Sequence, residues 1–166
     1  MKLSMPKERG PSITVIAGIS ERLGMVYFDV FAGSNNSDRF LAFLQHLKLH
    51  KDGRASVVLD NLKIHKAKKL DEVYDDAFRE LYLPPYSSPL NPIERLWAVV
   101  KQKWSKQLHQ FTEKIYSRQQ QDRITEEAVD AIRGIIGKYA ISKNFHHWAC
   151  WPAGSIARKK LNKFIH

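Results

Sequence analysis

Two acidic residues stand at positions where an α/β protein can carry chemistry. Asp60 directly follows the apolar run Val57-Val58-Leu59, and Glu94 follows Asn91-Pro92-Ile93. A carboxylate at the carboxyl end of a buried strand can reach the crevice in which ligands gather in open α/β sheets. Mg²⁺ accepts one or two carboxylates together with water and phosphate oxygens. The pair therefore predicts a site for a hard divalent cation, and a third acidic group is needed if that site is to hold two ions.

Each of these acidic residues also has a structural interpretation. Asp60 can make a turn or cap the segment that follows it. Asn91, Pro92 and Glu94 have the types expected at the cap, first and third positions of a helix, where a capping glutamate bonds back to the cap amide. Capping and metal binding compete for one Glu94 side chain, so both interpretations stay open at this point.

Three predicted strands and one helix must position Asp60. Ser12–Ile19 and Met25–Phe31 are short β-branched and apolar runs, which predict two strands joined in a hairpin. Ala55–Leu59 is apolar without alternation, as in a parallel strand covered on both faces. Between them, Ser37 can cap a helix whose apolar residues have helical spacing, namely Phe40, Leu41, Phe43, Leu44 and Leu47.

The segments after Asp60 continue the alternation of helix and strand. Lys66–Phe78 suits a helix, because Ala67, Leu70, Val73, Tyr74 and Ala77 share one stripe. We expect a strand at Glu80–Leu83, a proline-rich connection at Pro84–Pro92, a helix from Pro92 to about Lys106, and a polar, largely helical remainder at Phe111–His166 with its clearest helix at Thr125–Lys138. This order predicts an α/β fold with a partly parallel sheet.

Composition excludes several classes of protein. The 166 residues suffice for one domain with a core, and a single cysteine, Cys150, excludes a disulfide framework and a multi-cysteine zinc site. A zinc site built on His146, His147 and Cys150 is also disfavoured, because adjacent histidines do not share a helical face. Absence of a long apolar run and of a signal-like start makes a cytoplasmic protein without membrane contact the default expectation.

The charge is basic and uneven. Lys and Arg number 27 against 17 Asp and Glu, a formal charge of +10, and residues 101–166 hold 13 of these basic residues against 5 acidic ones. Such an excess suits a polyanionic partner, since phosphate contacts supply affinity independent of sequence. A solvated basic surface with no partner is the alternative.

Taken together, Val57–Asn61, His65 and Leu83–Glu94 resemble the DDE transposases of the mariner-type and related bacterial insertion-sequence group. That family has a strand ending in Asp-Asn, a nearby His, a leucine-proline-proline-tyrosine-serine-proline run, and an asparagine-proline-isoleucine-glutamate motif. The 33 residues between Asp60 and Glu94 are close to the family's usual spacing. The motifs span about residues 57–103, with weaker similarity back to Ser12, and Ser88 stands where relatives often have proline.

The resemblance implies an RNase H-like fold and DNA strand cleavage and transfer in transposition, with two Mg²⁺ or Mn²⁺ ions. Asp60 would be the second acid of the catalytic triad and Glu94 the third. The implied partners are transposon-end and target DNA and a second copy of the chain, and the protein would associate with the nucleoid when DNA is bound. Supporting roles fall to Asn61, His65 and Asn91, and DNA phosphate contacts to Lys63, Lys66, Lys101 and Lys103, for which a solvated surface is the alternative.

The family's first aspartate has no counterpart here. It ends a strand that precedes the hairpin, whereas Glu8 is the only acid among the eleven residues before Ser12, and Asp29 lies inside a hairpin strand. We therefore expect an RNase H-like mixed sheet without its first, central strand. The expected divisions are an N-terminal remnant at 1–11, a partial catalytic domain at 12–106 and a basic helical extension at 107–166.

Three functions remain open from these observations. The first is a transposase catalytic domain that is inactive by itself unless an upstream segment completes it. The second is a divalent-metal DNA nuclease that uses Asp60, Glu94 and another acid such as Asp29. The third is a non-catalytic DNA-binding or assembly module, whose DNA binding would depend on salt and survive loss of Asp60.

Overall fold

A β-hairpin lies in the middle of the molecule, with helices packed on both of its faces. The computed structural model describes residues 1–3, 12–51, 53–85, 87, 91–112 and 118–140. Strands β2 (Ile13–Ser20) and β3 (Gly24–Ala32) pair antiparallel, with a register shift between Gly18 and Ile19. The hairpin predicted from the two β-branched runs is confirmed.

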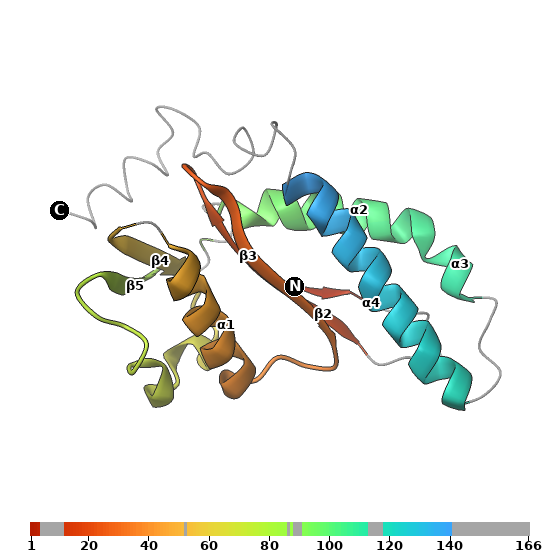
Figure 1. The fold of residues 1–166 in the computed structure, drawn as a ribbon, viewed down its shortest axis with the longest axis horizontal. Coiled ribbons are helices and arrows are strands. Elements are labelled where there is room, and N and C mark those ends of the chain that lie inside the picture. The colour runs from red at the N-terminus through yellow and green to blue at the C-terminus, as the bar shows by residue number, and fades with distance from the viewer. Residues whose placement is uncertain (4–11, 52, 86, 88–90, 113–117, 141–166) are drawn as a thin grey trace.

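Helices cover both faces of this hairpin. Helix α1 (Ser37–His50) packs on one face and α4 (Arg118–Ala140) on the other, as Figure 1 shows. Alternate side chains of a strand point to opposite faces. Accordingly Ile13 and Val15 pack with α4, while Ile16 packs with α1.

The helix predicted after Ser37 is confirmed, but its cap is one residue earlier. Asn36 has extended backbone angles, and its Oδ1 accepts a hydrogen bond from the Arg39 amide at 2.9 Å. This side chain satisfies an amide at the helix start that has no partner within the helix. The buried side of α1 belongs to a cluster that we call the α1 core: Phe40, Phe43, Leu44, Leu47, Leu59, Leu70, Val73 and Phe78.

A second, parallel sheet carries Asp60. Strand β4 (Ala55–Leu59) pairs with β5 (Phe78–Tyr82) from Ala55↔Phe78 to Leu59↔Tyr82. Both predicted strands and their parallel direction are confirmed. The expectation that Ala55–Leu59 is covered on both faces is wrong, because only Leu59 is buried and Ser56 is exposed.

The helix predicted over Lys66–Phe78 is wrong. Two 3₁₀ turns, η1 (Lys63–Lys66) and η2 (Lys68–Leu70), are followed by a tight turn. In that turn the Asp75 carboxylate accepts from the Ala77 amide at 2.7 Å, and Asp75 and Phe78 form an isolated bridge. This local bonding competes with a helix, as aspartate side chains often do.

Within the described ranges, three helices follow the second sheet. They are, in chain order, α2 (Ile93–Gln107), the short α3 (His109–Thr112) and α4. The helices predicted at about 92–106 and 125–138 are confirmed. Of the polar, largely helical remainder predicted at 111–166, residues 113–117 and 141–166 lie outside the described residues. Helices α2 and α4 bury a second cluster against the hairpin, the α4 core, which includes Leu3, Ile13, Val15, Val30, Leu96, Trp97, Val100, Trp104, Phe111, Ile124, Ala128, Val129, Ile132, Ile135 and Ile136.

The N-terminal residues add a strand that the sequence did not predict. Strand β1 (Lys2–Leu3) pairs antiparallel with Thr14 and Ile13, so the sheets are β1-β2-β3 and β4-β5. This mixed α/β architecture is consistent with the expected RNase H-like fold. Among the described residues, no helix combines the length and apolar character that a membrane crossing requires.

Candidate active site

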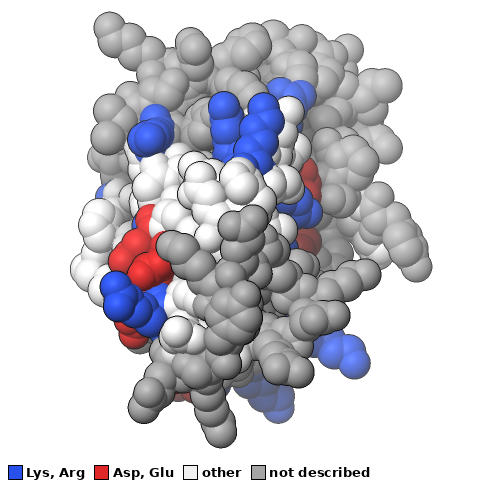
Figure 2. Space-filling model, turned by 90° about the vertical axis from the view of Figure 1, so that its right-hand side faces the viewer, with Lys and Arg blue, Asp and Glu red and all other residues white. Residues whose placement is uncertain are grey.

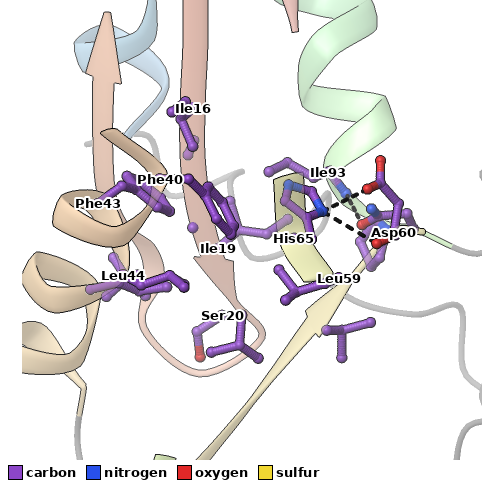
Figure 3. A pocket seen from close by; sticks show the side chains of 18 of the residues that line it. Ile16, Ile19, Ser20, Phe40, Phe43, Leu44, Leu59, Asp60, His65 and Ile93 are labelled. Carbon is purple, nitrogen blue, oxygen red and sulfur yellow. Dashed lines mark hydrogen bonds and ion pairs between the residues drawn. The ribbon is translucent and has the colours of Figure 1, made fainter. Parts of the chain in front are cut away.

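A cavity of about 760 Å³ lies between the two sheets. Consecutive residues of β2 and all of β4 line it, although alternate side chains of a strand point to opposite faces. The cavity therefore borders the backbone edges of both strands. Apolar side chains of α1 and β2 line one side, and Asp60, at the end of β4, lies on the other (Figure 3).

Asp60 lies at the carboxyl end of β4, as its sequence position predicted. Its side chain is 47% exposed, and its Oδ1 lies 2.8 Å from His65 Nδ1 and accepts from the Leu62 amide at 3.2 Å. The Leu62 contact is the turn-forming bond of the structural interpretation. Because both contacts use Oδ1, the carboxylate keeps an oxygen with no hydrogen bond to the described residues.

His65 and Asn61 hold the end of β4 in place. The imidazole of His65 contacts the Asp60 carboxylate and lies 3.2 Å from the Asp60 carbonyl oxygen, as Figure 3 shows. The Asn61 side-chain amide donates to the Leu83 carbonyl, while the Leu83 amide donates to Leu59. Asn61 therefore ties the ends of β4 and β5 together.

Glu94 lies on the first turn of α2, next to the cavity. The helix begins at Ile93 with Pro92 as its cap, one residue later than predicted, and the Asn91 side chain accepts a long bond from the Ile93 amide at 3.4 Å. Glu94 is exposed, and its carboxylate makes no hydrogen bond to the Asn91 amide or to another described residue. The carboxylate is thus available, as metal binding requires.

The amino group of Met1 connects the two carboxylates electrostatically. It lies between the sheets, where it donates to the Val15 carbonyl at 2.8 Å. Burial lowers the pKa of this amine, Glu94 opposes the shift, Lys101 adds to it, and Asp60 opposes it. The Met1 nitrogen therefore lies within electrostatic reach of Glu94, Lys101 and Asp60, and burial makes its charged form less favourable.

The predicted DNA-contacting lysines are all exposed. Lys63 and Lys66 follow Asp60 on η1, and Lys101 and Lys103 follow Glu94 on α2. Figure 2 views the molecule from another side, where the described Lys and Arg side chains stand in separate groups, some of them beside acidic residues. On that face the described residues form no continuous basic surface.

The sequence did not predict two residues that support the site. Phe40 stacks on the His65 ring with centroids 4.3 Å apart, and the Tyr82 hydroxyl donates to the His65 carbonyl at 2.5 Å. Phe40 was assigned to the core by its helical spacing, which carries no signal for an imidazole partner. Asp29, the alternative third acid, does not line the cavity. No group of three His, Cys, Asp or Glu residues able to hold a metal occurs within the described ranges.

Comparison with known proteins adds one match. The family described as DDE superfamily endonuclease matches residues 2–116, which include both sheets, α1, α2 and the two carboxylates. No curated protein matches the chain at a significant level. Because the match covers more than half of the chain, this protein belongs to the DDE superfamily endonuclease family.

Proposed function

We propose that this chain supplies Asp60 and Glu94 to a metal-dependent DNA cleavage and strand-transfer site of a mariner-type transposase. The observation that carries the proposal is the position of both carboxylates beside one cavity. Membership of a DDE endonuclease family gives the reaction class, phosphodiester chemistry on DNA.

The two carboxylates suit one divalent cation. Asp60 has a free oxygen and Glu94 an uncommitted carboxylate, and Mg²⁺ or Mn²⁺ takes such oxygens readily. A bound ion would supply charge stabilisation for the attacked phosphate. The residues of this chain would hold Asp60 through His65 and Leu62, and present Glu94 from α2.

We infer that a further segment, which carries an acidic residue, enters the cavity and completes the site. Among the described residues, no strand pairs with β4 or with β2 beyond Val15 on the edges that face the cavity, and strand addition to such an edge is a common mode of recognition. Strand β1 already follows this path, because Met1 exchanges hydrogen bonds with Val15 at 2.8 and 2.9 Å. Continuing antiparallel pairing would carry an upstream segment along β2 beside β4.

DNA contacts are proposed for the lysines next to each carboxylate. Lys63 and Lys66 lie on the turn after Asp60, and Lys101 lies on the helix that carries Glu94. Phosphate contacts make DNA affinity fall as salt rises. Substitution of Lys101 by Gln should weaken binding to all sequences similarly and reduce the salt slope by about one.

The first test is Mn²⁺ binding to the purified chain, measured by calorimetry. Asp60→Ala and Glu94→Ala should each lower affinity at least tenfold, since even an outer-shell change typically costs about 10- to 100-fold. Asp29→Ala is the matched control, because Asp29 is acidic and lies outside the cavity, and it should bind as the wild type does. Equal loss in Asp29→Ala would contradict the proposed ligands.

The second test concerns cleavage and the completing segment. The DNA upstream of the coding sequence should encode a strand that ends in aspartate, and protein joined to that segment should nick supercoiled plasmid with Mg²⁺. An upstream region without such a strand would exclude the joined site. Salt-sensitive DNA binding that survives Asp60→Ala, with no Mn²⁺ binding in the wild type, would instead identify a non-catalytic DNA-binding module.

A further inference from the structure

We propose that Phe40 is a positioning residue of the candidate active site, which acts through His65 to orient the Asp60 carboxylate. The inference rests on the proposed function for its consequence, because an oriented Asp60 matters when it binds a cation. It assigns a role to a residue of α1 that otherwise serves as part of the α1 core.

The Asp60 carboxylate depends on His65 for its orientation. The side chain is nearly half exposed, so water alone would leave it free to rotate. Its Oδ1 has two donors, the Leu62 amide at 3.2 Å and His65 Nδ1 at 2.8 Å, and the imidazole contact is the shorter. With Oδ1 held, the other oxygen is directed away from these donors and stays available.

His65 depends in turn on Phe40. The histidine side chain is 12% exposed, and its ring stacks on Phe40 with a centroid distance of 4.3 Å and an interplanar angle of 30°. The backbone of His65 is bonded separately, through its amide to Leu62 and its carbonyl to the Tyr82 hydroxyl. Those bonds fix where the side chain begins. The Asp60 oxygens hold Nδ1 at one edge of the ring, and Phe40 packs against the face of the ring. Figure 3 shows Phe40, His65 and Asp60 together.

Packing alone would not require an aromatic ring at this position. Phe40 is 3% exposed in the α1 core, where leucine would also bury apolar area. A flat face opposite an imidazole is what leucine lacks, and aromatic pairs stabilise each other beyond their buried area. Phe78 offers a matched comparison, because it is 1% exposed in the same core but its ring stacks on Tyr74.

The test compares Mn²⁺ affinity and unfolding free energy in Phe40→Leu and Phe78→Leu. Both variants should lose stability, but only Phe40→Leu should bind Mn²⁺ more weakly, by about 2- to 10-fold, the range that an aromatic pair contributes. His65→Ala should lose about 10- to 100-fold. In the double variant, Phe40→Leu should add nothing to His65→Ala, because its effect passes through the missing imidazole.

An NMR measurement at constant pH keeps the inference separate from the proposed function. The imidazole should carry its proton on Nδ1, facing Asp60, and its carbon-bound protons should show a ring-current shift from Phe40. Phe40→Leu, or Phe40→Met if the leucine variant fails to fold, should remove that shift and weaken the Nδ1–H signal. Phe78→Leu should leave both signals unchanged.

The outcomes separate the two ideas. Unchanged imidazole signals in Phe40→Leu would overturn the positioning role, as would equal Mn²⁺ loss in the Phe40 and Phe78 variants. A wild type that binds no Mn²⁺ would instead contradict the proposed function, and the imidazole signals would still decide whether Phe40 holds His65 against Asp60.

Discussion

At the scale of single residues, the hydroxyl groups of two tyrosines, Tyr74 and Tyr82, differ in whether they have a hydrogen-bond partner. The Tyr74 hydroxyl is buried with no hydrogen-bond partner among the described residues, whereas the Tyr82 hydroxyl donates to the His65 carbonyl. Burial raises the pKa of Tyr74, and the nearby Tyr82, Glu80 and Asp71 act in the same direction. An unpartnered buried hydroxyl opposes folding, since it loses water without replacement.

We therefore expect Tyr74→Phe to raise the unfolding free energy by up to about 1 kcal/mol, because removing a buried group without a partner removes its desolvation cost. Tyr82→Phe is the control and should lower it by about 1 kcal/mol, the usual worth of a made hydrogen bond. Urea unfolding of both variants measures the difference. Equal losses in the two would mean that Tyr74 has a bonded hydroxyl after all.

At the scale of elements, a close approach sets the spacing between β2 and α1. A Cβ placed on Gly18 would lie 2.4 Å from Cδ1 of Leu47, so the strand and helix meet at a position where only glycine fits without rearrangement. The bulge in the hairpin is next to this glycine. Leu47 belongs to the same α1 core as Phe40.

Gly18→Ala should lower the unfolding free energy by about 1 kcal/mol, the low end of the usual overpacking cost, because the end of the Leu47 side chain can shift. In the Gly18→Ala background, Leu47→Ala should cost less than in the wild type, because it relieves the clash. Gly134→Ala on α4 is the control, since a Cβ there meets nothing within 4 Å, and it should be neutral or stabilising. Additive effects of the Gly18 and Leu47 substitutions would contradict the proposed contact.

Helices and strands could be predicted from the sequence where the apolar pattern and the local hydrogen bonding favour the same structure. The hairpin and β4 were predicted from short β-branched or apolar runs, and α1 from apolar residues at helical spacing. Helix α2 was predicted from the residue types at its start. Lys66–Phe78 also has a helical period, but Asp75 bonds the Ala77 amide and ends any helix there. Leu70 and Val73 reach the α1 core from turns instead.

Candidate site residues could be named from the sequence where they form a linear motif. Asp60, His65 and Glu94 belong to linked motifs, so their family resemblance was visible in the chain. The contribution of Phe40 was not, because its His65 partner lies 25 positions away and meets it only after α1 packs. The availability of the Glu94 carboxylate also depended on the observed helix start at Ile93.

At the scale of the whole molecule, one hairpin serves two cores. Ile13, Val15 and Val30 belong to the α4 core, while Ile16, Val26 and Tyr27 pack against the α1 core. Helix α4 is also hydrogen-bonded directly to the hairpin, since the Arg133 guanidinium donates to the Val30 carbonyl at 2.9 Å. Loss of either core should therefore weaken the other.

Ile132→Ala and Leu44→Ala test this coupling from opposite sides, since both side chains are fully buried. Each should lower the unfolding free energy by about 2–5 kcal/mol, the usual cost of such a truncation. Amide hydrogen exchange should show lower protection in the hairpin and in both cores for each variant. Normal protection of α1 and β4 in Ile132→Ala would mean that the two cores unfold independently.

The bond between Arg133 and Val30 also bears on the order of synthesis. The two residues are 103 positions apart, so the ribosome completes the hairpin long before it makes the helix that covers its second face. At about 5–20 residues per second, that interval lasts roughly 5–20 s. During it, α1 can already shield one face, while Val15 and Val30 remain open to chaperones or to a neighbouring nascent chain.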